Sequence, residues 1–341
     1  MDTENRYIIK ADHILPLLRK LQMQFEILAP IPGRGKDILF GPLKKIEDVI
    51  INYNQMLPSP KNILFPQIEY LFNYESKNIK EYKPENFGKI LFGLHSCDVK
   101  SIKILSDFFL RQPIDNYFKS RLENITLINI VCTNPFDTSF CESTRSGPYL
   151  KSGFDLQLTP MENKYLIEIG SQKGAELIKN YRWFFKNIYK TEIEEQFEIF
   201  LQAEGKLNRG IDFSTVVKRI QNKEIEFSFW ETLALNCVDC GSCTYICPVC
   251  TCFNVVDKAY SDNTGDRVRV WDACTYRGFT EMAGGSNPRK SLAERLRHKF
   301  LHKLLYTIKD FNYPGCVGCG RCDICFGHIG MYEVAKKIIN Y

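Results

Sequence analysis

The sequence of 341 residues contains no long apolar run. A membrane-spanning helix needs about 18 consecutive apolar residues with few or no charges, and no stretch approaches that length. The first fourteen residues carry five charged side chains, so they show neither the apolar centre of a signal peptide nor the acid-poor pattern of a transit peptide. We therefore expect a cytoplasmic protein that does not insert into a membrane itself.

An excess of one charge sign is also missing. The 45 Lys and Arg side chains and the 40 Asp and Glu side chains leave a net charge of +5, which is too small and too evenly spread to predict nucleic-acid binding. Low-complexity segments are absent, and 44% apolar residues are typical of a chain that buries a core. We expect two domains, since a single core stops growing at roughly 250–300 residues.

Cysteine is scarce in the first two thirds of the chain and concentrated near the end. Of the fourteen cysteines, only Cys97, Cys132 and Cys141 precede residue 236. Because cytosolic thiols are kept reduced, these residues are better interpreted as metal or redox ligands than as disulfides. The uneven distribution predicts a boundary near residue 230, with domains at 1–230 and 231–341.

The N-terminal part alternates strand and helix patterns. Residues 89–94 and 125–131 are short apolar runs that predict buried strands, and residues 99–110 between them have apolar side chains at helical spacing. This order predicts an α/β N-terminal domain, followed by an α+β ferredoxin-like domain that contains the cysteine-rich segments. Residues 181–230 are mostly helical in pattern, and we expect core positions for their aromatic residues, among them Trp183, Phe184, Phe185, Phe197 and Phe200.

In the C-terminal part, residues 267–271 predict a short strand and residues 288–311 one long helix, with Asn287 and Pro288 at its start. A solvent-exposed basic face is the simpler interpretation of the many cationic residues of this helix. The alternative is that the basic face docks an acidic partner or offsets the negative charge of nearby clusters. Apolar residues recur every four positions at Leu292, Leu296, Phe300, Leu304 and Ile308, and the basic residues are Arg289, Lys290, Arg295, Arg297, Lys299 and Lys303.

The first cysteine motif has the spacing C-x2-C-x2-C-x3-C-P, formed by Cys237, Cys240, Cys243, Cys247 and Pro248. This spacing is typical of bacterial ferredoxins, in which one tight loop holds three corners of a [4Fe–4S] cube. Thiolates suit the site because cluster iron prefers soft, charge-donating ligands. A zinc-stabilised scaffold is the rival interpretation, but the spacing and the trailing proline fit a cluster better.

The second cysteine motif, formed by Cys316, Cys319, Cys322 and Cys325, departs from the ferredoxin spacing at its last cysteine. Its fourth cysteine, Cys325, comes after two residues instead of three and is followed by Phe326 instead of proline. The fourth cysteine of such a motif normally ligates the other cluster. We therefore expect one cluster on Cys237, Cys240, Cys243 and Cys325, and a second on Cys316, Cys319, Cys322 and Cys247. If Cys325 does not reach the first cluster, a water, His328 or another neighbour completes that ligand set.

The remaining cysteines form two groups. Cys250, Cys252 and Cys274 surround the first motif, where they are either inert buried thiols or ligands of an additional metal centre. Cys97 and Cys132 follow the two predicted strands, and ligand sites in open α/β sheets lie at such strand ends. With Cys141 they form a candidate third cluster, for which the fourth ligand would be an oxygen of Asp98, Asp137 or Ser139; buried thiols are the alternative.

A different class of function is a substrate site at the same strand ends. There His95, Cys97, Asp98, Cys132 and Cys141 would supply a nucleophile and a base. The sequence shows no fixed nucleophile–base motif in this region and no Gly-rich phosphate loop after a strand. A relay of electrons is therefore the preferred interpretation over an enzyme with its own N-terminal active site.

Several further motifs accompany the cysteines. They are H-S-C-D-V-K-S-I at 95–102, S-G-P at 146–148, G-F-D-L at 153–156, the first cysteine motif with its extension P-V-C-T-C-F, W-D-A-C at 271–274, A-G-G-S-N-P-R at 283–289, A-E-R-L-R-H-K-F at 293–300 and C-V-G-C-G-R-C from 316. Through these motifs the chain, from about residue 25 onward, resembles the iron–sulfur beta subunits of cytoplasmic NiFe hydrogenases (sulfhydrogenases). It is more distantly similar to the A-type subunits of anaerobic sulfite reductase. The two segments A-G-G-S-N-P-R and G-F-D-L favour the hydrogenase type.

The resemblance implies an electron-transfer protein without an active site of its own. Its partners would be a flavin subunit that exchanges electrons with NADH or NADPH, and a catalytic subunit of the NiFe hydrogenase or sulfite reductase type. Where such relatives often carry two cysteines in a C-F-C pattern, this chain has Ser139 and Cys141. The third cluster would then lack one of the family's cysteine ligands.

The cysteine motifs make a prediction about metal content. Protein purified without oxygen should be brown and should contain about eight iron and eight sulfide per chain, because two cubane clusters require them. Iron analysis and acid-labile sulfide analysis measure both values. About twelve iron would support the N-terminal site, and zinc without labile sulfide would contradict the cluster interpretation.

Overall fold

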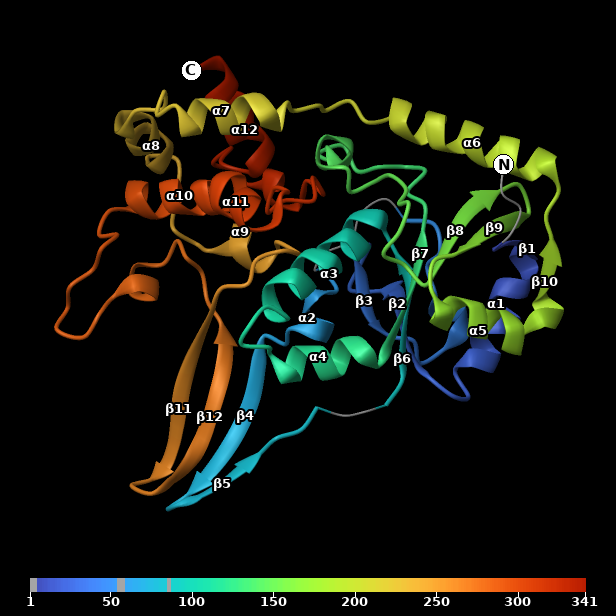
Figure 1. Cartoon of the computed structure of the whole chain (residues 1–341), viewed down its shortest axis with the longest axis horizontal. Coiled ribbons are helices and arrows are strands. Elements are labelled where there is room, and N and C mark those ends of the chain that lie inside the picture. Colours follow the sequence, from blue (N-terminus) through green and yellow to red (C-terminus); the bar gives the residue numbers. More distant parts are fainter. Residues whose placement is uncertain (1–4, 54–58, 85–86) are drawn as a thin grey trace.

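The computed structural model describes residues 5–53, 59–84 and 87–341 and contains two β-sheets within those ranges (Figure 1). The larger sheet has the strand order β10-β1-β9-β8-β7-β6-β2-β3, and the smaller has the order β11-β12-β4-β5. The strands are β1 Arg6–Lys10, β2 Glu26–Pro32, β3 Ile38–Pro42, β4 Ile68–Glu75, β5 Asn78–Glu81, β6 Lys89–Leu94, β7 Ile125–Ile130, β8 Leu156–Met161, β9 Lys164–Ile169, β10 Phe185–Asn187, β11 Phe253–Ser261 and β12 Thr264–Trp271.

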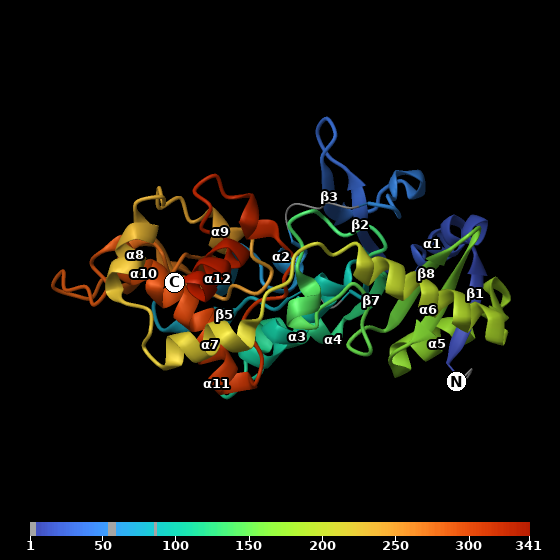
Figure 2. The same cartoon turned by 90° about the horizontal axis from the view of Figure 1, so that it is seen from above.

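The helices lie around the larger sheet and in the C-terminal part (Figure 2). None of those that the structure describes is long and apolar enough to span a bilayer. Their bounds are α1 Ile14–Leu21, α2 Lys61–Leu64, α3 Ser96–Phe109, α4 Asn116–Glu123, α5 Gln172–Asn180, α6 Lys190–Gly205, α7 Phe213–Gln221, α8 Phe227–Ala234, α9 Ser242–Tyr245, α10 Leu292–Leu301, α11 Thr307–Phe311 and α12 Met331–Asn340.

Both faces of the larger sheet are buried at its centre, where β2, β6, β7 and β8 run parallel. On β6, Ile90 and Phe92 pack with α1 and α5 on one face, whereas Leu91 and Leu94 pack with α3 and α4 on the other. Parallel strands covered on both faces by helices are continuously apolar, as the sequence of β6 is. The predicted strand–helix–strand order is confirmed for β6, α3 and β7.

The C-terminal helices form a separate hydrophobic cluster around Trp230 and Phe300, whose rings lie 5.9 Å apart. The cluster includes residues of α7, α8, α10 and α12, and it also takes in Phe140 from the N-terminal part. Apart from Phe140, its residues start at Ile211, before the boundary that we expect near residue 230. The expected core role is wrong for Trp183 and Phe197, which are 68% and 55% exposed.

The predicted long helix is interrupted and starts later than expected. It begins at Leu292, and Ser291 caps it by accepting a hydrogen bond from the Glu294 amide. Residues His302–Tyr306 form a π-helical segment before α11. Asn287 is not the N-cap, because its side chain bonds within the preceding loop, where it donates to the Arg277 carbonyl at 2.7 Å.

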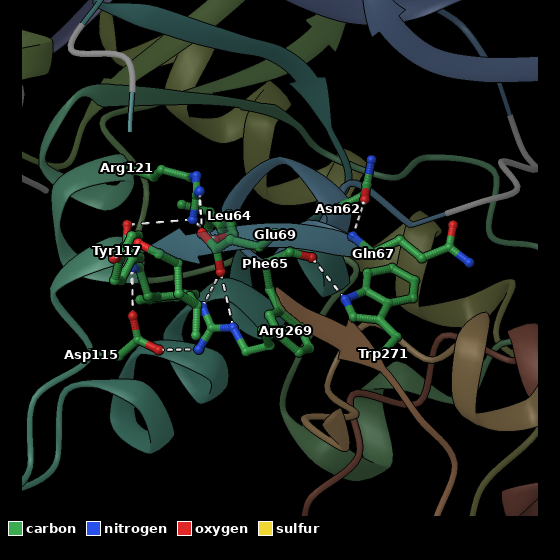
Figure 3. Close-up of polar contacts among 12 residues, drawn as sticks. Asn62, Leu64, Phe65, Gln67, Glu69, Asp115, Tyr117, Arg121, Arg269 and Trp271 are labelled. Carbon is green, nitrogen blue, oxygen red and sulfur yellow. Dashed lines mark hydrogen bonds and ion pairs between the residues drawn. The ribbon is translucent and has the colours of Figure 1, made fainter. Parts of the chain in front are cut away.

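The smaller sheet joins segments that lie far apart in the sequence, because β4 pairs with β12. At its base, the buried carboxylate of Glu69 is bound by Arg269 on β12 and by Arg121 on α4, and Arg269 also pairs with Asp115 (Figure 3). The side chains of Glu69 and Arg269 are only 3% and 5% exposed. This ionic network fixes the hairpin of β11 and β12 against the N-terminal part.

The network predicts a stability difference between buried and exposed ion pairs. Glu69→Gln should lower the free energy of unfolding by about 3 kcal/mol, because it leaves buried guanidinium groups without their anion. The control is Asp257→Asn, which breaks a 44% exposed pair with Arg267 on the same hairpin and should cost at most about 1 kcal/mol. Denaturant unfolding under anaerobic conditions measures both, and equal losses would contradict the assigned role of Glu69.

Candidate metal centres

The two cysteine loops share one backbone conformation. Gly241 and Gly320 follow the second cysteine of each motif with φ of 69° and 71°, and Asp239 and Gly318 precede it with φ of 55° and 58°. All four residues therefore lie in the left-handed region, which favours glycine. A cube wrapped by a short loop requires such turns, and their repetition indicates that both loops are built for the same group.

Backbone amides in both loops point at the first cysteine sulfur. Asp239 N donates to Cys237 Sγ at 3.4 Å, and Gly318 N donates to Cys316 Sγ at 3.3 Å. Such bonds favour a charged thiolate over a neutral thiol, because the amide dipole stabilises negative charge. Both loops are thus arranged around anionic sulfur.

The four cysteines expected at the first cluster line a single cavity. It is formed by Cys237, Cys240, Cys243 and Cys325, with Cys322 beside them. Cys325 leaves the short 3-10 turn Arg321–Ile324 in an extended conformation, so its shortened spacing still brings it to this cavity. His328, the possible replacement ligand, is not among the residues that line it.

The four cysteines expected at the second cluster line a neighbouring cavity. Cys243 and Cys322 border both cavities, so the two sites adjoin each other. This arrangement follows from the crossing of the chain, in which each loop sends its last cysteine towards the other site. The second cavity is bordered by Cys247, Cys316, Cys319 and Cys322.

Two buried lysines, one on α10 and one on the π-helical segment that follows it, contact cysteine sulfurs of the first motif. Lys299 Nζ lies 2.8 Å from Cys243 Sγ, and Lys303 Nζ lies 3.3 Å from Cys247 Sγ. Although burial opposes their charge, the neighbouring sulfurs outweigh it and raise the pKa of both ammonium groups. The solvent-exposed interpretation of the basic face is therefore wrong for Lys299, Lys303 and Arg295, which are 3%, 7% and 5% exposed.

A third buried lysine, Lys61, was not singled out from the sequence. Its ammonium lies 3.4 Å from the Cys250 carbonyl and 3.8 Å from the centre of the Trp271 ring. Within the described residues, none of the three lysines forms a salt bridge with a carboxylate. No local sequence pattern identifies Lys61, because only the tertiary structure brings it to the cysteines.

The donor set fits iron–sulfur clusters. Buried ammonium groups need a nearby anion, and cysteine thiolates bound to iron supply it. In the part of the chain that the structure describes, no group of three or more His, Cys, Asp or Glu side chains is arranged to hold one metal ion. A zinc site needs four ligands around one ion, whereas the corners of a cube stand farther apart. The geometry therefore favours clusters over zinc.

The three N-terminal cysteines also meet in one cavity. Cys97 lies in the first turn of α3, Cys132 follows β7, and Cys141 begins a 3-10 turn. Of the three oxygen ligands considered, Ser139 lines the cavity, whereas Asp98 is fully buried in an ion pair with Arg321 at 3.0 Å. Asp137 is not among the lining residues.

The environment of this cavity does not activate a cysteine nucleophile. Burial raises the pKa of the Cys132 and Cys141 thiols to about 12, and burial lowers the pKa of His95 to about 4. The His95 ring is stacked on Tyr53 at 4.1 Å. A reactive cysteine needs a lowered pKa, so the interpretation as an enzyme with its own N-terminal active site loses support.

The last group, Cys250, Cys252 and Cys274, lines a further cavity together with Lys299 and Lys303. The sequence left two interpretations open for these residues, inert thiols and an additional metal centre. The structure brings all three to one place.

Comparison with known proteins agrees with this geometry. Residues 236–329 match the family described as a 4Fe-4S dicluster domain, so two [4Fe–4S] clusters are implied. The chain is 30% identical over 346 aligned positions to sulfhydrogenase 2 subunit beta of Pyrococcus furiosus, and the alignment covers 98% of both proteins. No protein of solved structure matches the chain.

The placement of Cys325 can be tested directly. Cys325→Ser should abolish the EPR signal of the first reduced cluster, because it removes one of its four thiolates. His328→Ala is the matched control, three residues away, and should leave both cluster signals intact. If Cys325→Ser leaves both signals unchanged, the ligand assignment at that corner is wrong.

Proposed function

Because the chain belongs to the family of sulfhydrogenase beta subunits, we propose that it relays electrons between a flavin subunit, which exchanges electrons with NADH or NADPH, and a NiFe hydrogenase catalytic subunit. Membership of this family implies an iron–sulfur electron-transfer subunit of a multi-subunit hydrogenase complex. We propose in addition the two kinds of partner subunit, and that the chain transfers electrons without converting a substrate.

One observation carries the proposal: the cysteine sites adjoin one another. The first and second cavities share Cys243 and Cys322, and the N-terminal cavity borders Cys319 of the second loop. Adjoining redox sites in one chain support stepwise transfer of single electrons. An enzyme that converts a substrate would instead need a cavity with an activated nucleophile or base.

The first site is placed for exchange with a partner. Cys240 is exposed, and Val238 and Phe326 beside the same cavity are 63% and 72% exposed. Exposed apolar side chains around a redox site favour close contact with another protein chain. We assign this surface to one of the two partner subunits.

The chain's own residues hold and tune the clusters, which supply one-electron redox chemistry when bound. Lys299 and Lys303 place positive charge beside sulfurs of both sites. Because positive charge stabilises a reduced cluster more than an oxidised one, these lysines raise the reduction potentials. The amides of Asp239 and Gly318 act in the same direction.

We also assign a third cluster to the N-terminal cavity, with Cys97, Cys132 and Cys141 as thiolate ligands and Ser139 as the oxygen ligand. The support is that all four side chains line the cavity. The second cysteine loop closes one side of it, since Phe140 N donates to the Gly318 carbonyl at 2.7 Å. A cluster there would extend the relay into the N-terminal part.

Reconstitution with partner subunits tests the relay. NADH or NADPH alone should not bleach the visible absorption of the isolated chain, because a nucleotide delivers hydride and not single electrons. A flavin subunit should allow bleaching, and a hydrogenase subunit should then restore the colour with release of hydrogen. Cys240→Ser and Cys319→Ser should each lower the rate of hydrogen release at least tenfold.

The same experiment separates the alternatives. Co-purification with a sirohaem subunit would favour the A-type role in anaerobic sulfite reductase over the hydrogenase type. Rapid nucleotide-dependent turnover by the isolated chain would overturn the relay and return attention to the N-terminal cysteines as an active site.

A further inference from the structure

The hairpin of β11 and β12 brings three further cysteines together. Cys250 and Cys252 precede β11, and Cys274 follows β12. The two strands pair antiparallel with Phe253 opposite Trp271, and the Asp272 amide donates to the Cys252 carbonyl at 3.0 Å. The open end of the hairpin therefore fixes Cys252 and Cys274 beside each other.

The three cysteines are gathered at one place beside cationic side chains. Cys250 and Cys274 are 8% and 5% exposed. An inert buried thiol behaves as a small hydrophobic group and packs among others. Here all three line a cavity that is bordered by the cationic residues Lys299 and Lys303 as well as by apolar side chains such as Phe108 and Phe311.

Cationic side chains lie beside this group of cysteines. Lys303 borders the cavity while its ammonium reaches Cys247, and Lys61 lies 3.4 Å from the main-chain carbonyl of Cys250. A buried ammonium group is unfavourable without a nearby anion. A metal-bound thiolate at Cys250 would place negative charge near Lys61.

We propose that Cys250, Cys252 and Cys274 bind an additional iron–sulfur cluster, distinct from the two dicluster sites and from the N-terminal site. Three soft thiolates select an iron–sulfur cluster or zinc, and the two [4Fe–4S] clusters implied for the adjoining loops favour iron and sulfide here as well. A fourth cysteine is not among the residues that line this cavity, whereas His302 and Asp310 are, so one of these side chains or a water would complete the ligand set.

The additional cluster would lie next to the second dicluster site and could exchange electrons with it. Cys247, an expected ligand of the second cluster, precedes Cys250 by three residues, so one short loop joins the two groups. Lys303 contacts Cys247 and borders the cavity of the additional cluster, so its charge acts on both. Electrons that reach the second cluster then have two neighbouring sites beyond the first.

Iron analysis of the full chain, purified without oxygen, tests the additional cluster. The two dicluster sites account for about eight iron, and the N-terminal and additional clusters together raise the expected total to about sixteen. Cys252→Ser and Cys274→Ser should each lose about three to four iron per chain, because one cluster is lost, while the EPR signals of the two dicluster sites keep their intensity. Thr251→Ala is the matched control, since Thr251 is a buried residue between two of the cysteines that borders the same cavity, and it should keep all its iron. Iron equal to that of the unmodified protein in either serine variant would overturn the proposal.

A second variant keeps the proposal testable if the serine variants fail to fold. In a chain with Cys97, Cys132 and Cys141 all replaced by serine, more than about eight iron should remain, because the dicluster sites account for only eight. Eight or fewer would overturn the proposal. Neither outcome bears on the relay, which is read separately from reduction of the two dicluster signals by the flavin subunit.

Discussion

The contact between buried lysines and cysteine sulfurs is the constraint on which the C-terminal part depends. Lys299 and Lys303 are one helical turn apart, and they meet Cys243 and Cys247, which are also four residues apart. A helix and a cysteine loop can pair in this way only if the helix lies against the loop in one register. The π-helical segment around Lys303 occurs at this place, as such segments often do at functional sites.

The second constraint is the close packing of the second cysteine loop against the N-terminal part. Asp98, next to Cys97, forms a buried ion pair with Arg321, which lies between two cysteines of that loop. A Cβ atom on Gly318 would lie 2.5 Å from the Phe140 carbonyl oxygen, so only glycine lets the loop approach the N-terminal part this closely. Sites that belong to different segments of the sequence are thereby held next to each other.

Local patterns in the sequence predicted those features that depend on local geometry. The strands β6 and β7 and the helix between them follow from apolar runs and spacing, and the cysteine motifs follow from the tight loops that a cube requires. The single helix expected at 288–311 was wrong because its start is set by the capping box of Ser291 and Glu294, four residues later than the Asn-Pro signal. The prediction of an exposed basic face was wrong for Arg295, Lys299 and Lys303, because charge alone does not reveal which neighbours a helix meets.

The sequence by itself determined which cysteines form the two dicluster loops, since spacing over a few residues dictates how a short loop can wrap a cube. It also predicted the parallel strands that carry Cys97 and Cys132 to one edge of the sheet. Only the tertiary structure decided that Cys325 reaches the first cavity, that Lys61 approaches Cys250, and that Cys274 lies beside Cys252. Those arrangements depend on the packing of distant segments, which no local pattern records.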